Sequence, residues 1–174
     1  MQLIRCTAKL LKELKQDPVA NVKPIRDVMG GWHANLLRIE RRKCVLVTND
    51  KTLYTIFIPG LKKQEFIDFD EVFRQHLFKN LLHEELLQNR IEAVLDELGT
   101  IRFARTDNRS VLGSMNDLKF QLEFHIASRG GLACTPLYEL NARLNRTPFS
   151  AIDNRRPIDR LSELLDTQCR ETDA

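Results

Sequence analysis

The sequence has no long apolar run and no paired cysteine motif. Its longest apolar stretches, such as CVLV and TIFI, fall far short of the roughly 20 residues that span a bilayer, and QLIRC after Met1 is not typical of a signal peptide. The four cysteines are scattered singly, without a C-x-x-C pair, so neither a zinc ribbon nor a disulfide framework is indicated. We expect a cytoplasmic protein without a membrane partner, with reduced thiols and with Cys6 and Cys44 in the core.

The signatures of common enzyme classes are also missing. The chain has no G-x-x-x-x-G-K phosphate loop, no G-x-G-x-x-G dinucleotide motif and no G-x-S-x-G nucleophile elbow. None of the four histidines has a second histidine at the i, i+4 spacing of helical zinc motifs. We therefore predict no metal site and no cofactor, and we find no motif that supports nucleotide-dependent or hydrolase-type chemistry.

Length and hydrophobic periodicity predict one α+β domain. A chain of 174 residues, 43% of them hydrophobic, has the size of a single core. We expect one globular domain over residues 1–168 and a disordered tail over 169–174. The chain should begin with a strand in QLIRCT and a helix in AKLLKEL, and residues 16–31, with two prolines and a terminal glycine pair, should form an irregular loop.

The middle of the chain predicts a sheet with helices packed on one face. Three strand-like runs, WHANLLRIE, KCVLVT and TLYTIFIP, are separated by polar tips and indicate an antiparallel meander. Two amphipathic helices are expected within residues 62–98, followed by a strand in TIRFART and a long helix over 108–128. The expected fold is a mainly antiparallel sheet of about five strands, with these helices covering one face.

The long helix raises the question of its polar residues. Its apolar residues recur at helical spacing and should form a buried stripe of Val111, Met115, Leu118, Leu122 and Ile126. Asp107 or Asn108 is suited to cap the helix. Gly113 costs about 1 kcal/mol relative to alanine inside a helix, so we expect it to sit against another backbone. The alternative is a ligand or phosphate surface on the polar face, formed by Arg109, Asn116 and Asp117 with Gly113.

Charge is unevenly distributed along the chain. Residues 62–98 carry nine acidic against five basic residues, whereas bases exceed acids elsewhere and the formal net charge is +3. Arg38, Arg41, Arg42 and Lys43 cluster at the first predicted hairpin tip, where a basic two-stranded ribbon is able to follow phosphates, although a solvated turn is the simpler interpretation. Such asymmetry is compatible with an anionic partner.

One histidine is a candidate general base. His33 and Asn35 alternate onto the same face of their predicted strand, and His33 would act as a base if an acid or an anion-binding arginine met it in space. A polar residue without catalytic function is the commoner outcome for a single histidine in a strand.

Four segments together resemble a bacterial domain family without assigned activity. They are IRCTAKLLKEL, WHANLLRIERRKCVLVTNDKTLYTIFIPGLKK, TDNRSVLGSMNDLKFQLEFHI and LNRTPFSAI, and they cover nearly the whole chain. The resemblance implies a stand-alone protein or a domain beside plasmid-type reading frames. It also implies that a functional surface should be sought among the polar residues of WHANLL, RRKCVL, FIPGLKK and NRSVLGSMND.

Three functions remain open at this stage. The first is a non-enzymatic cytoplasmic module that binds nucleic acid or a protein partner through a basic surface. The second is a small metal-independent ribonuclease-like enzyme, with His33 as base and with Arg109 and the tip from Arg41 to Lys43 holding phosphate. The third is a purely structural interaction protein. The sequence does not determine the oligomeric state.

Overall fold

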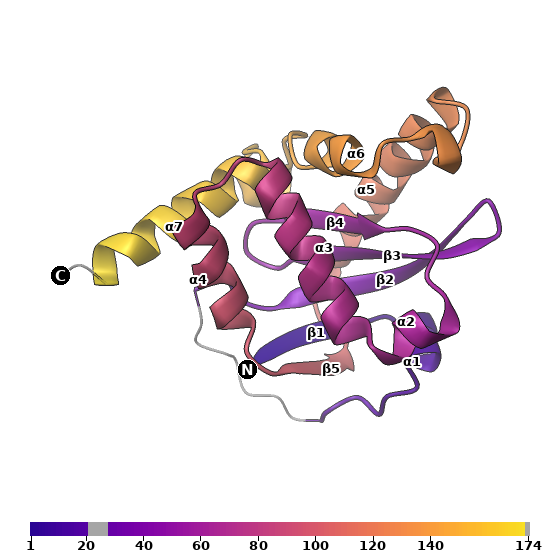
Figure 1. Ribbon diagram of the computed structural model, residues 1–174, viewed down its shortest axis with the longest axis horizontal. Helices are drawn as coiled ribbons and strands as arrows, with labels where there is room; N and C mark the ends of the chain where they lie inside the picture. The colour runs from indigo at the N-terminus through magenta and orange to yellow at the C-terminus, as the bar shows by residue number, and fades with distance from the viewer. Residues whose placement is uncertain (21–27, 173–174) are drawn as a thin grey trace.

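The computed structural model describes residues 1–20 and 28–172, with side chains as far as residue 167 (Figure 1). Its strands are β1 (Gln2–Cys6), β2 (Trp32–Ile39), β3 (Arg42–Asn49), β4 (Thr55–Ile58) and β5 (Ile101–Arg105). Its helices are α1 (Ala8–Leu14), α2 (Lys63–Ile67), α3 (Phe69–His83), α4 (Gln88–Leu98), α5 (Arg109–Ser128), α6 (Leu137–Leu144) and α7 (Pro157–Thr172), with short 3₁₀ turns at Leu132–Cys134 and Ser150–Ile152. No helix within the described ranges has the length and apolar character needed to cross a membrane.

The five strands form one open sheet in the order β4-β3-β2-β1-β5. The predicted meander is confirmed, because β2 pairs with β3 and β3 with β4 in antiparallel fashion. Its first turn is Glu40–Arg41, where both residues have positive φ, 48° and 66°, as the tight two-residue hairpin turn requires. β1 is parallel to both neighbours, β2 and β5. The mostly antiparallel α+β class is confirmed, and the parallel pairings of β1 are an addition to it.

Helices pack on both faces of the sheet, which corrects the expectation of one covered face. Along β3, Val45 and Val47 join a core cluster with α3 and α4, whereas Cys44 and Leu46 join a second cluster with α5 and α6. In Figure 1, α3 crosses in front of the sheet and α5 lies behind it. The segment CVLV of β3 explains why both faces are covered. A strand buried on both faces has a continuous run of apolar residues, whereas a strand buried on one face alternates apolar with polar residues. Cys6 and Cys44 are buried as expected, and burial raises the pKa of both thiols.

Two further boundaries differ from the sequence expectation. Residues 62–98 form three helices, because Asp68, with φ −98° and ψ 31°, separates α2 from α3. At the other end, α7 continues to Thr172, four residues into the segment 169–174 that the sequence predicts as a tail. Part of the expected irregular loop, residues 21–27, lies outside the described residues, as do residues 173–174.

The long helix α5 is confirmed in its cap and its buried stripe. The Asn108 side chain accepts hydrogen bonds from the amides of Ser110 and Val111, and all five predicted apolar residues are buried. The expectation for Gly113 is wrong, because the residue is exposed and a Cβ built on it has no neighbour within 4 Å. Close packing therefore does not account for this glycine.

Candidate functional site

Four ionisable side chains meet on the sheet face that carries α5. Arg5 of β1 and His33 of β2 are register partners, Asp50 directly follows β3, and Asp107 follows β5. Arg5 donates from Nη1 to Asp50 Oδ2 at 3.1 Å and from Nε to Asp107 Oδ2 at 2.9 Å. His33 Nδ1 lies 2.6 Å from Asp50 Oδ1, and its Nε2 lies 3.6 Å from Asp107 Oδ1. We call Arg5, His33, Asp50 and Asp107 the polar network.

The backbone around the polar network leaves room for it. A Cβ on Gly31 would collide with Nη1 of Arg5 and with Oδ2 of Asp50, so the ion pair passes over a position where only glycine fits without rearrangement. His33 is completely buried, whereas the Asp107 side chain is 62% exposed. The network therefore connects residues in or just after four strands, and only its outer carboxylate, Asp107, is largely exposed to solvent.

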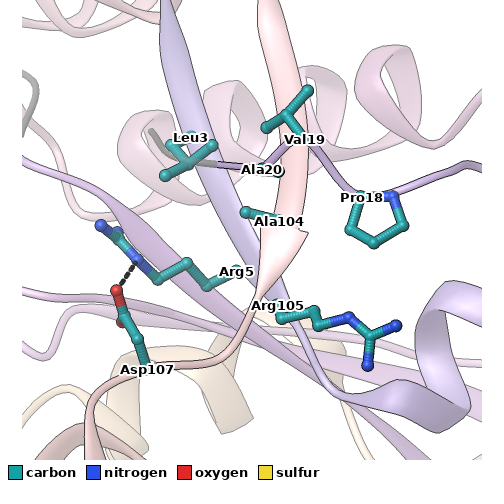
Figure 2. Close-up of a pocket in the computed structure, with 8 residues that line it drawn as sticks. All are labelled: Leu3, Arg5, Pro18, Val19, Ala20, Ala104, Arg105 and Asp107. Carbon is teal, nitrogen blue, oxygen red and sulfur yellow. Dashed lines mark hydrogen bonds and ion pairs between the residues drawn. The ribbon is translucent and has the colours of Figure 1, made fainter. Parts of the chain in front are cut away.

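A cavity of about 290 Å³ borders the polar network on the β5 side. Figure 2 shows Arg5 and Asp107 on one side of it, Leu3, Val19 and Ala104 above, and the Arg105 side chain directed away from the Arg5–Asp107 pair. His33 does not line this cavity. The buried imidazole contacts Asp50 through Nδ1, whereas its Nε2 is buried without a hydrogen-bond partner among the described residues, so the ring joins the strands and is not exposed to the cavity.

We predict that Asp50→Ala lowers the free energy of unfolding by about 2 kcal/mol, because it leaves the buried His33 and the largely buried Arg5 without their shared acceptor. Urea denaturation measures this loss. Asp117→Ala on the exposed face of α5 is the control and should change stability by less than about 0.5 kcal/mol. Equal stability of wild type and Asp50→Ala would mean that the network contributes nothing to the fold.

A second cavity, of about 550 Å³, opens where β1 ends and β2 continues. Its polar lining comes from the start of α1, from β2 and from α5, and consists of Thr7, Lys9, Asn35, Arg38, Asn116 and Lys119. We call these six residues the basic notch. The lining contains three cations and no carboxylate, although Lys119 Nζ lies 3.7 Å from Glu123 Oε1 on the same helix. Thr7 Oγ1 donates to Asn35 Oδ1 at 3.1 Å and fixes the floor of the notch.

A third cavity, of about 450 Å³, is lined mainly by α1 and the segment after it. It shares Ala8 with the second cavity, and it shares Pro18 and Arg105 with the cavity beside the polar network. Besides Arg5, which is paired with Asp50 and Asp107, six cations line the three cavities. We call these six residues the basic rim: Lys9, Lys12, Lys15, Arg38, Arg105 and Lys119. Asp17 and Asp107 are the acidic residues of this lining. The ends of parallel strands, where α/β sheets commonly bind ligands, are therefore basic in this protein.

The residues predicted for binding fall into two groups. Asn35 and Asn116 come together in the basic notch. Arg109 and Asp117 are exposed on α5 but do not line the notch, and Arg41 and Arg42 are exposed at the hairpin end.

Lys43 differs from its predicted role. Its Nζ donates to Glu13 Oε2 at 2.7 Å and lies 5.9 Å from the centre of the Phe66 ring. The residue points to the α1 and α2 side of the sheet, so it is not a free cation of the hairpin tip.

The structure does not assemble a joint site from His33 and the hairpin tip. Arg42 pairs with Ile39, six residues along β2 from His33, which corresponds to about 20 Å in an extended strand. The phosphate-holding arrangement expected from the sequence is therefore absent between these residues. Within the described residues, no three His, Cys, Asp or Glu side chains are arranged to hold a metal ion.

Sequence reasoning missed most of the cations that line the cavities and two members of the polar network. Arg5 and Asp50 are ordinary polar residues in the sequence, and Asp107 was considered as a helix cap. The available signal was a charged residue inside a short apolar strand. Arg5 lies between Ile4 and Cys6, which are both buried.

The chain matches one known family over most of its length. Residues 3–160 match the family described as a domain of unknown function, DUF6933. Neither a curated protein nor a solved structure matches the chain. The resemblance noted in the sequence agrees with this match at the level of a family without assigned activity. On the extent of the match, the chain belongs to the DUF6933 family.

Proposed function

We propose that the protein is a non-enzymatic binding module that holds an anionic macromolecular partner against the basic rim. The observation that carries this proposal is the grouping of the six cations of the basic rim around three neighbouring cavities that share lining residues. Lys9 and Arg38 have no ion-pair partner among the described residues, so their charge is available to a ligand. Clustered cations of this kind attract anionic partners and accelerate their association.

Two exposed aromatic residues favour a macromolecule over a small anion. Phe120 and Phe124 on α5 are 70% and 69% exposed. Phe120 follows Asn116 of the basic notch by one helical turn, so an apolar surface continues from the notch along the helix. Exposed aromatic side chains beside cations are typical of interfaces with other macromolecules.

The catalytic alternative has less support. A ribonuclease-like mechanism requires a base that reaches the substrate and cations that hold phosphate beside it. His33 is buried against Asp50. Arg42 pairs with Ile39, which lies six residues after His33 along β2. A bacterial, plasmid-associated setting and a cytoplasmic location form part of our proposal, supported by the sequence resemblance and by the singly scattered cysteines.

We predict that charge reversal in the basic notch weakens polyanion binding. Arg38→Glu should weaken binding of labelled polyglutamate or labelled single-stranded RNA by at least about tenfold, because it replaces an attraction by a repulsion at an exposed contact. Fluorescence anisotropy at several salt concentrations measures the effect. For the wild type, the logarithm of the affinity should fall linearly with the logarithm of the salt concentration.

The control for this experiment is Lys79→Glu, which changes the net charge equally on the exposed surface of α3, across the sheet from α5. It should alter affinity by less than about threefold. A salt-independent affinity, an equal loss in both variants, or no binding of either polyanion would contradict the proposal.

A further inference from the structure

The two outer edges of the sheet are covered by the chain itself. At β4, Asn145 Oδ1 accepts from the Thr55 amide at 2.7 Å and its Nδ2 donates to the Thr55 carbonyl at 2.8 Å. One helical turn earlier, Asn141 makes the same pair of contacts with Phe57, at 2.9 and 3.4 Å. At β5, the Val19 amide donates to the Phe103 carbonyl at 2.9 Å. Side-chain amides and an extended segment thus occupy positions where another strand would pair.

The second half of β2 has no such cover. β1 pairs with β2 only as far as Ala34, whose carbonyl accepts from the Thr7 amide at 3.0 Å before the chain turns into α1. Backbone groups alternate in direction along a strand, so the N–H and C=O groups of Leu36 and Arg38 point to the same side as those of Ala34. The hairpin supports this assignment. Ile39 and Arg42 flank the two-residue turn, so their main-chain groups face each other, and the main-chain groups of Arg38 therefore point away from β3.

This free edge lies in the basic notch. Leu36 and Arg38 line the cavity, and within the described part of the chain no side chain or loop backbone forms a hydrogen bond with their main-chain groups. The cavity volume of about 550 Å³ is within the usual range of ligand-binding pockets. A row of outward donors and acceptors at strand spacing is therefore open to a ligand that is able to pair with it.

The charges around the edge select the occupant. Lys9, Arg38 and Lys119 surround it, and a second copy pairing through the same edge would bring Arg38 close to its counterpart, which like-charge repulsion disfavours. An extended peptide with carboxylates meets both the cations and the backbone groups. Nucleic acid meets the cations but does not offer alternating amide donors and carbonyl acceptors at the spacing of a strand.

We propose that an acidic, extended segment of a partner protein adds to the sheet along β2, pairing with Leu36 and Arg38 in line with β1. Its carboxylates contact Lys9, Arg38 and Lys119. This inference rests on the proposed function, because it names the partner class of the same basic rim.

The experiment compares two peptides that carry the same carboxylates. One is a short labelled peptide of alternating glutamate and valine, and the other is the same peptide with every backbone nitrogen methylated, which removes the donors of a strand edge. We expect the methylated peptide to bind at least about tenfold more weakly. Amide hydrogen exchange of Leu36 and Arg38 should slow by at least about tenfold with the unmodified peptide. Exchange at the amides of the exposed residues Ser128 and Arg129, at the end of α5, should not change.

Other outcomes separate the inference from the proposed function. Equal binding of both peptides, or RNA binding without peptide binding, would overturn strand addition and leave anion binding at the basic rim intact. Absence of binding by peptide, polyglutamate and RNA would overturn both. Concentration-dependent dimerisation that protects Leu36 and Arg38 without peptide would overturn the inference by showing that a second copy occupies the edge.

Discussion

Replacing Asn145 by alanine should lower the free energy of unfolding by about 3 kcal/mol. Asn145 is completely buried, and its side-chain amide satisfies both the N–H and the C=O group of Thr55 on the outer strand β4. Alanine leaves both buried groups without a partner, and each unsatisfied group costs about 1–3 kcal/mol. For a domain of this size the loss corresponds to a fall in melting temperature of about 10 °C, which thermal denaturation followed by circular dichroism measures.

Two variants make this prediction specific. Asn145→Asp keeps an acceptor for the Thr55 amide but places a carboxylate against the Thr55 carbonyl, so it should destabilise the protein at least as much as alanine does. Asn116→Ala removes an exposed asparagine from α5 and should change stability by less than about 0.5 kcal/mol. If Asn145→Ala is as stable as wild type, the side-chain amide does not protect the edge of β4.

The fold was predictable where local patterns decide it. The meander follows from apolar runs separated by tight polar turns, and α5 follows from apolar residues three or four apart with Asn108 before them. The continuous apolar run of β3 indicates burial on both faces, but it does not indicate which helices cover each face. The distinction depends on where α5 and α6 return to the sheet, which is a long-range property.

The site depends on such long-range properties throughout. Arg5 and Asp107 are 102 positions apart in sequence, and only the parallel pairing of β1 with β5 brings their side chains together. The basic notch exists because β1 ends at Cys6 while the neighbouring strand β2 continues to Ile39. This difference in where the two paired strands end cannot be predicted from the sequence of either strand alone. Asn35 and Asn116 were found because each carries a polar group on a recognisable element, whereas Lys9 and Lys119 resemble ordinary surface lysines in the sequence.

Two asparagines, one in α6 and one directly after it, are a sequence signal that indicates the covered edge of β4. Asn141 and Asn145 are four residues apart and therefore lie on one face of a helix, next to the buried Leu140 and Leu144. Buried amides on an apolar helix face require partners, and main-chain groups of an outer strand are suitable ones. The contrast between this covered edge and the open edge of β2 is the strongest structural reason to assign binding to the basic notch.

Met115→Ala should lower the free energy of unfolding by about 2–5 kcal/mol, whereas Arg109→Ala should change it by no more than about 0.5 kcal/mol. Met115 is 1% exposed in the core between α5 and the sheet, so alanine loses buried apolar area and leaves a cavity. Arg109 is exposed in the first turn of the same helix and has no ion-pair partner among the described residues. Urea denaturation of both variants tests whether the buried stripe or the polar face of α5 maintains the fold. Comparable destabilisation by the two substitutions would make Arg109 a structural residue and would remove it from any binding surface on α5.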